Sequence, residues 1–242
     1  MTTIRLDELT STEFGKLVKK NPLVIIPLGA VEEHGSHLPL CTDSVQPEYI
    51  AEKVADKIKG PVLIAPSIRY GNCVSTRNFP GTLSISSKTL RLLMKDIISE
   101  LARNGIRKVM VLSGHAGGAH MVTLREAGEA VVDSCPDMKL MILSDYDIAY
   151  ELRGKEFDDK DGHAGTIESS RVMAIKPKLV KGTRRNRASF TRPPKFMTVA
   201  HPEEFFPGGY MGDPSKASPA QGRRINAYIV QGLLEHISKN FG

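Results

Sequence analysis

The stretch IPLGAVEEHGSHLPLCTD, residues 26–43, joins the end of a predicted buried strand to a loop rich in carboxylates and imidazoles. Glu32 and His34 are two residues apart, so in an extended segment their side chains point to the same side while Glu33 points away. Asp43 follows after a glycine and a proline, which can turn the chain back toward the same place. Carboxylate and imidazole together are the ligand set that zinc, manganese and ferrous iron favour. The stretch by itself indicates either a metal site or a group of solvated polar side chains.

Strand and helix patterns alternate along the rest of the chain. Amphipathic patterns predict helices at 12–20, at 47–60, from Ser86 or Ser87 to Asn104, at 122–134 and at 223–238, and apolar runs predict strands at 23–30, 61–71, 106–114 and 138–145. The connections are short, and the strands are apolar almost throughout, as expected where helices cover both faces of a sheet. The sequence therefore predicts an α/β fold, a single three-layer α/β/α domain over residues 1–242 with a mostly parallel central sheet.

The composition is that of an ordinary globular protein. The 242 residues are 40% hydrophobic and 25% charged, and no apolar run reaches the about 18–20 residues that a membrane span needs. The N-terminal segment is charged throughout and lacks the apolar core of a signal peptide. We therefore expect a cytoplasmic protein with no membrane partner. Cys41, Cys73 and Cys135 are scattered and odd in number, so no disulfide framework is expected; Cys41, near Asp43, is a candidate ligand or nucleophile, and a packed thiol is the commoner alternative.

The net charge of +6 is concentrated in one segment. Between Lys176 and Lys195 there is no acidic residue, and the rest of the chain has a net charge of −2. A general nucleic-acid binder carries its positive charge over a whole face, so no nucleic-acid partner is expected. The cluster fits a phosphorylated small-molecule substrate, a subunit contact or a solvated loop. Its basic residues are Lys176, Lys178, Lys181, Arg184, Arg185, Arg187, Arg192 and Lys195.

Polar clusters follow the predicted strands at the point where each strand ends. The strand at 23–30 leads to the carboxylates and imidazoles of the opening stretch, and the strand at 106–114 leads to HAGGAH, residues 115–120. The strand at 138–145 leads to a loop that reaches DGHAGTIESS, with His163 and Glu168. Ligands of open α/β sheets bind beyond the carboxyl ends of the strands, so three loops bring histidines and carboxylates to one edge, which favours a metal site.

The glycine-rich SGHAGGAH allows one other interpretation. Glycines between a strand and a helix can cradle a phosphate at the helix N-terminus, as in a kinase or nucleotide-binding module. The stretch lacks the GK[ST] ending of a P-loop and the G-x-G-x-x-G of a dinucleotide site, so this interpretation is the weaker one.

Four motifs in order resemble the creatininase (creatinine amidohydrolase) family. PLGAVEEHGSHLPLCTD resembles the family pattern PxGxxExHGxHLPxxTD; FPGT at 79–82, SGHAGG at 113–118 against NGHGGN, and HAGTIESS at 163–170 against HxGxxETS follow in the family's order. The resemblance extends from about residue 22 to about residue 237. It implies a creatininase-like fold and a metal-dependent hydrolase that cleaves non-peptide carbon–nitrogen bonds.

The resemblance also implies the cofactors and their ligands. Two divalent metal ions are expected, Fe²⁺ or Zn²⁺, with Mn²⁺ as a further choice. Glu32 and His115 would hold one ion, His34 would hold the second, and Asp43 would bridge the two. Glu168 falls at a downstream glutamate of the family, beside or on the second ion.

The catalytic roles follow from the same resemblance. Water ionised by the metals would attack an amide carbonyl. His163 falls at the family's catalytic or substrate-orienting histidine, and His163, or Glu168 if it is not a ligand, would pass a proton to the leaving nitrogen.

Departures from the family pattern bear on the substrate. Creatininase proper has a tyrosine and a metal-binding glutamate where this chain has Ala116 and Gly117, and a tryptophan that closes over the substrate where this chain has Asp159. These differences disfavour creatinine. The second metal lacks one expected ligand, which Glu168 or His120 would replace.

Among family members that lack these creatininase residues, this chain resembles most in kind the archaeal formamidopyrimidine-nucleotide deformylases. They release formate from a ribosylaminopyrimidine phosphate on the route to riboflavin and deazaflavin coenzymes, and ferrous iron is their expected metal. The basic residues between Lys176 and Lys195 would then bind the phosphate of the substrate. Creatinine hydrolysis, and a non-catalytic metal- and nucleotide-binding maturation partner, are the alternatives.

Residues 201–222 form a long segment rich in glycine and proline. Such a segment is typically an active-site wall or a subunit contact, and a local cover for the sheet edge is the simplest alternative. Phe205, Phe206 and Tyr210 are its candidate contact residues. The resemblance implies a homo-oligomer, often a hexamer.

Overall fold

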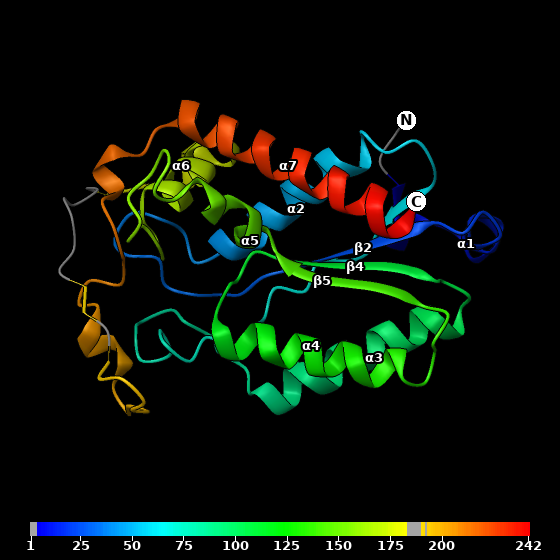
Figure 1. The fold of residues 1–242 in the computed structure, drawn as a ribbon, viewed down its shortest axis with the longest axis horizontal. Helices are drawn as coiled ribbons and strands as arrows, with labels where there is room; N and C mark the ends of the chain where they lie inside the picture. Colours follow the sequence, from blue (N-terminus) through cyan, green and yellow to red (C-terminus); the bar gives the residue numbers. More distant parts are fainter. Residues whose placement is uncertain (1–3, 183–189, 192) are drawn as a thin grey trace.

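A computed structural model describes residues 4–182, 190–191 and 193–242. Its centre is a five-stranded sheet in the order β1-β3-β2-β4-β5, in which all paired strands are parallel (Figure 1). β2 and β4 pair along their whole length, as do β4 and β5, so these three strands end level with one another. The predicted parallel sheet is confirmed. The strands are β1 (Ile4–Arg5), β2 (Leu23–Leu28), β3 (Val62–Ile64), β4 (Lys108–Ser113) and β5 (Lys139–Ser144).

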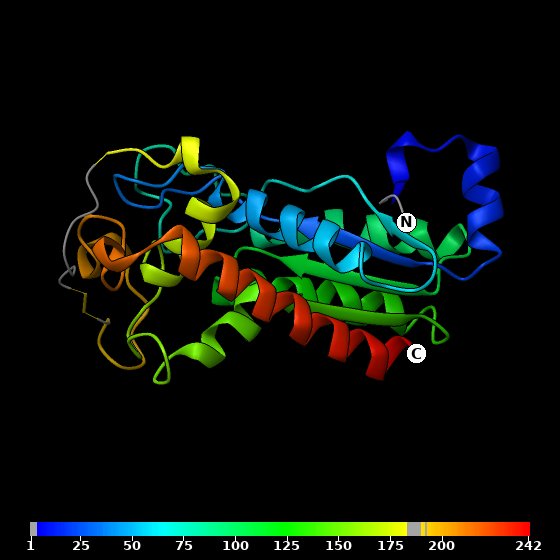
Figure 2. The ribbon, with the colours of Figure 1, turned by 90° about the horizontal axis from the view of Figure 1, so that it is seen from above.

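Helices cover both faces of the sheet, which confirms the three layers (Figures 1 and 2). Successive residues of β2 point to opposite faces: Ile25 belongs to the hydrophobic cluster with Ile229 of α7, whereas Val24 belongs to the cluster with Leu90 and Met94 of α3. This double burial explains why the strands are apolar throughout. One layer holds α2 (Thr42–Ala55), α5 (Asp145–Ala149), α6 (Thr166–Ile175) and α7 (Pro219–Phe241); the other holds α3 (Ser87–Arg103) and α4 (Gly118–Val132).

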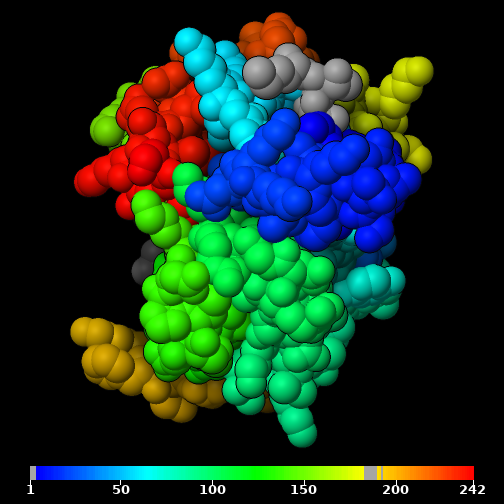
Figure 3. Space-filling model, turned by 90° about the vertical axis from the view of Figure 1, so that its right-hand side faces the viewer, coloured from blue at the N-terminus to red at the C-terminus, as the bar shows by residue number. Residues whose placement is uncertain are grey.

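The N-terminal segment covers the amino ends of the strands. Figure 3 shows this segment, in blue, on the face of the molecule at which the strands begin. It includes α1 (Ser11–Val18), whose Phe14 and Leu17 pack against the cluster on the α3 side of the sheet. The carboxyl ends of the strands lie at the opposite end of the molecule, where loops cover them (Figure 1). Within the described ranges, no helix is both long and apolar enough to cross a membrane.

Helix α2 begins at Thr42, five residues before its predicted start at Pro47. A proline inside a helix removes one hydrogen bond and usually marks the first turn, which is why the pattern predicted a later start. The first turn of α2 can pack closely against the ends of β2 and β4 because the residues that follow these strands are glycines. A Cβ on Gly29 or Gly114 would come within 2.4 or 2.1 Å of the Asp43 carbonyl oxygen. Asp43 therefore lies in the first turn of a helix packed on the ends of β2 and β4, directly after the loop that was predicted to turn the chain back.

Two other predictions of secondary structure were wrong in extent. The strand predicted at 61–71 is regular only over β3, because Pro66 has no N–H to continue the ladder. Its neighbours Ala65 and Ile68 still donate to β2, at 2.8 and 3.0 Å. The predicted loop at 161–170 contains the start of α6, so Glu168 lies in a helical first turn.

Candidate metal centre

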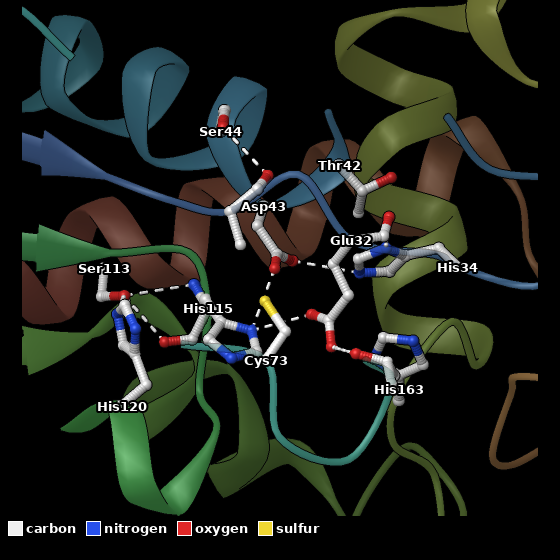
Figure 4. Close-up of polar contacts among 12 residues, drawn as sticks. Glu32, His34, Thr42, Asp43, Ser44, Cys73, Ser113, His115, His120 and His163 are labelled. Atoms are coloured by element: carbon white, nitrogen blue, oxygen red, sulfur yellow. Dashed lines mark hydrogen bonds and ion pairs between the residues drawn. The ribbon is translucent and has the colours of Figure 1, made fainter. Parts of the chain in front are cut away.

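The predicted ligands converge at the carboxyl edge of the sheet (Figure 4). Two follow β2, one follows β4, and two lie in the first turns of α2 and α6. All are buried, with at most 7% of each residue exposed. The sheet thus brings together side chains that lie up to 136 positions apart in the sequence. They are Glu32, His34, Asp43, His115 and Glu168.

Asp43 lies between two imidazoles. Its Oδ1 is 3.0 Å from Nε2 of His34, and its Oδ2 is 3.0 Å from Nδ1 of His115 (Figure 4). Glu32 Oε2 lies 2.8 Å from the same His115 nitrogen, and Glu168 Oε2 lies 3.6 Å from the His34 nitrogen. The five side chains therefore form two groups that share one carboxylate.

Several of these atoms are close to a polar neighbour but make no hydrogen bond. Glu32 Oε2, Asp43 Oδ2 and His34 Nε2 are buried without a hydrogen-bond partner. Burying such atoms unsatisfied is costly, so a further group is expected to bind them. Ligand atoms of His34, Asp43 and Glu168 all lie within 4.8 Å of one another. Carboxylate oxygens and imidazole nitrogens suit divalent transition metals, and these residues therefore fit two such ions.

The charges in the cluster also suit a cation. Burial opposes ionisation of Asp43, but the nearby His34 and His115 outweigh burial and hold the pKa of Asp43 below its usual value. Burial likewise opposes protonation of His34, yet Asp43 and Glu168 outweigh it and raise the pKa of His34 well above its usual value. Without metal, protons on the imidazoles balance the carboxylates, and a divalent cation can replace them.

Backbone carbonyl groups orient both imidazoles. Nδ1 of His34 lies 3.0 Å from the carbonyl oxygen of Glu32, and Nε2 of His115 lies 3.1 Å from that of Asn72. A ring N–H that donates to a carbonyl leaves the other nitrogen free to bind metal. The free nitrogens are the two that face Asp43.

His120 lies behind His115 and does not face the shared carboxylate. The N–H of Asn72 donates to Nδ1 of His120 at 3.2 Å, so Nε2 carries the proton and donates to Ser113 Oγ at 3.2 Å. Ser113 in turn donates to the carbonyl oxygen of His115 at 2.7 Å. Burial and the nearby His115 lower the pKa of His120 to about 2, so it is neutral. Asn72, His120, Ser113 and His115 thus form a closed hydrogen-bond ring, which the sequence motif alone does not reveal.

His163 is held beside the cluster by Glu33. Nε2 of His163 lies 2.8 Å from the carbonyl oxygen and 3.3 Å from Oε1 of Glu33, and its ring lies 4.3 Å from the ring of His34, centroid to centroid. The Glu33 carboxylate, which was predicted to point away from Glu32, is buried beside His163. Gly209 makes room for it, because a Cβ there would lie 2.0 Å from Oε2 of Glu33.

The Glu168 carboxylate is held by Tyr146 of α5 and by the backbone of the loop that precedes α6. Its Oε1 lies 2.5 Å from the Tyr146 hydroxyl, and its Oε2 accepts the Ala164 N–H at 2.5 Å. Burial raises the pKa of Tyr146, which keeps the hydroxyl protonated as a donor. Arg171 lies over the Tyr146 ring and forms a fully buried ion pair with Asp145. No sequence signal identified Tyr146, because its contact with Glu168 depends on the packing of two helices.

A cavity of about 210 Å³ opens onto the cluster. Phe206 and Met211 of the segment 201–222 line it, and Phe206 is buried within its own chain. Two residues of that segment therefore form part of the cavity wall, and the interpretation as an active-site wall stays a prediction. Asp159 is exposed and does not line the cavity, and of the residues described, no lysine or arginine does.

The basic segment is only partly described. Lys176, Lys178, Lys181 and Lys195 are exposed, and Arg184, Arg185, Arg187 and Arg192 lie outside the described residues.

Comparisons with known proteins identify the family of this chain. The creatininase family profile, described as creatinine amidohydrolase, matches residues 7–237. Creatinine amidohydrolase from Pseudomonas putida is 29% identical over 99% of this chain and 98% of its own length. A mycofactocin precursor peptide peptidase from Mycolicibacterium smegmatis is 30% identical over 90% of this chain and 85% of its own.

Solved structures show the same similarity. A crystal structure of creatininase superposes with a TM-score of 0.86 at 27% identity, covering 100% of this chain and 99% of that one. A manganese form of creatininase has the same TM-score and identity and covers 99% of each chain. The chain belongs to the creatininase family and is a metal-dependent amidohydrolase of that family.

Proposed function

We propose that the cluster holds two divalent metal ions for the hydrolysis of an amide bond. Glu32 and His115 would bind one ion, and His34 and Glu168 would bind the other. Asp43 would bind both ions. The observation that carries this assignment is the position of Asp43, whose two oxygens face imidazoles from two different strand ends at 3.0 Å each. When bound, the ions would supply water that ionises near neutral pH and would polarise the substrate carbonyl.

We assign proton transfer to the leaving nitrogen to His163. It lines the cavity, and its Nε2 is bound to Glu33, so Nδ1 is the nitrogen that can exchange a proton with substrate. Glu168 is less suited to this role, because Tyr146 and the Ala164 N–H already engage its two oxygens.

The substrate we propose is a small formamide, most specifically the formamide of a formamidopyrimidine ribonucleotide on the route to riboflavin and deazaflavin coenzymes. The cavity is small, and the position that would carry the closing tryptophan of creatininase proper is the exposed Asp159. The basic segment begins next to the metal-binding loop, because the N–H of Lys181 donates to the carbonyl oxygen of His37 at 2.9 Å. Exposed lysines there would suit a substrate phosphate.

A peptide amide is the second candidate. The mycofactocin precursor peptide peptidase is as similar to this chain as creatinine amidohydrolase is. The aromatic side chains of Tyr146, Tyr150 and Phe206 line the cavity and would suit an apolar side chain of a peptide. Creatinine itself is the third candidate.

The proposal is tested with protein purified anaerobically and loaded separately with Fe²⁺, Zn²⁺ or Mn²⁺. Release of formate from the formamidopyrimidine nucleotide, creatine from creatinine and amine from a peptide amide ranks the three substrates. Asp43→Ala should lose both ions and all turnover, whereas Asp159→Ala, a change at an exposed carboxylate, should keep both. Two bound ions and normal turnover in Asp43→Ala would overturn the assignment.

The predicted oligomeric state and the predicted single domain can each be measured directly. A homo-oligomer, such as a hexamer, is checked by light scattering after size-exclusion chromatography. A single domain over residues 1–242 is checked by whether the protein unfolds in one cooperative transition.

A further inference from the structure

We propose that Cys73 is a ligand of the metal ion held by Glu32 and His115, through its thiolate sulfur. This inference rests on the proposed metal centre. Cys73 is buried beside the cluster, with 1% of the residue exposed (Figure 4). Its Sγ, a carboxylate oxygen of Glu32 and a ring nitrogen of His115 all lie within 4.8 Å of one another. The three side chains can therefore reach one ion beside the shared carboxylate.

The backbone around Cys73 is held in place by the same contacts that orient His115. Asn72, the preceding residue, accepts the His115 Nε2–H on its carbonyl oxygen and donates its N–H to His120. The N–H of Cys73 donates to Ser84 Oγ at 2.9 Å. The thiol and the imidazole are thus positioned as one unit.

The side of the cluster next to His115 and Cys73 is arranged to bind a cation. Oε2 of Glu32 and Oδ2 of Asp43 are buried without hydrogen bonds on the side of His115. The glycine-rich loop cannot supply a side chain there, because a Cβ on Gly117 would lie 2.6 Å from Nε2 of His115. Of the two other histidines near the cluster, His120 is bound within the hydrogen-bond ring, and Nε2 of His163 is held by Glu33.

The charges support the same conclusion. Before the bound water ionises, three carboxylates leave two divalent ions with one unbalanced positive charge, and a thiolate would neutralise it in a buried site, where net charge is costly. On binding, the Cys73 S–H bond breaks, a sulfur–metal bond forms, and the proton passes to solvent.

A thiolate changes which metal the site prefers. Sulfur is a soft ligand that favours Zn²⁺ and Fe²⁺, whereas sites made only of oxygen and imidazole accept Mn²⁺ readily. We therefore expect this chain to select zinc or ferrous iron over manganese. In Cys73→Ser this selectivity should fall at least about tenfold, since loss of even an outer partner of a metal ligand weakens binding about 10–100-fold.

Cobalt substitution tests the inference directly. The wild-type protein loaded with Co²⁺ should show a near-ultraviolet sulfur-to-cobalt charge-transfer band, which carboxylate and imidazole ligands do not produce. Cys73→Ser should lose the band, whereas the control variants Cys135→Ser and Cys41→Ser should keep it. Wild-type protein that binds two cobalt ions without the band would overturn the role of Cys73 and leave the proposed metal centre intact. Wild-type protein that binds no cobalt would overturn both.

A second measurement needs no variant, so it stands even if Cys73→Ser fails to fold. X-ray absorption of the zinc-loaded wild-type protein should show a sulfur neighbour at about 2.3 Å from zinc, the usual Zn–S distance. A zinc spectrum fitted only by nitrogen and oxygen neighbours would refute the assignment.

Discussion

Replacing His120 by phenylalanine should weaken metal binding without touching a metal ligand. The change leaves the Asn72 N–H without an acceptor and Ser113 Oγ without one of its donors, both in a buried site. An unsatisfied buried group costs about 1–3 kcal/mol. Unfolding entropy is about 2.1 cal/mol/K per residue, so for 242 residues the expected decrease in Tm is about 2–6 °C. The ring also orients His115, and losing an outer partner of a ligand typically weakens metal binding about 10–100-fold.

Calorimetric titration with Zn²⁺ and differential scanning calorimetry of the metal-free protein separate the two effects. His120→Gln keeps one acceptor and one donor and should recover much of the affinity. His236→Gln is the matched control, because His236 is exposed on α7 far from the ring. If His120→Phe is less stable but binds both zinc ions as tightly as wild type, the ring is only structural and the reasoning fails.

Three further predictions follow from the contacts around the cluster. Asp145→Ala leaves the buried Arg171 guanidinium without its charge partner, which should cost about 3–5 kcal/mol and lower Tm by about 6–10 °C; a decrease below about 2 °C in thermal unfolding would contradict this. Tyr146→Phe removes the hydroxyl that donates to Glu168, so stepwise metal titration should show only the second ion bound about 10–100-fold more weakly, and equal loss at both sites would argue against two separate groups. His34 has a raised pKa, so it is protonated near neutral pH in the metal-free protein and must release its proton to bind metal. Affinity should therefore fall as pH decreases, and calorimetry in buffers of different ionisation enthalpy should detect proton release; binding independent of pH would refute this.

Much of the architecture was predictable from local pattern. The apolar runs that became β2 and β4 identify buried parallel strands, because such strands are covered on both faces. The run that became β5 is a half-buried strand at the edge of the sheet. Boundaries were less predictable. Pro47 indicated a helix start, yet α2 begins earlier, because Gly29 and Gly114 allow the first turn to pack against the strand ends. The position of Asp43 on that turn depends on this packing.

The candidate ligands were identified by residue type and by their places after strand ends, but their supporting partners were not. Glu33, Tyr146 and His120 act through contacts with segments that are distant in the sequence. Such contacts have no periodic signature, so a single sequence does not reveal them.

The sequence by itself determined the alternation of strands and helices and the supply of carboxylates and imidazoles at the strand ends, because hydrophobic periodicity and residue chemistry are local properties. Only the tertiary structure decided which nitrogen of His34 and His115 faces Asp43, and that Cys73 lies within reach of the same site. The physical reason is that hydrogen-bond direction and ligand distance are set between segments, and the parallel sheet is what brings those segments together.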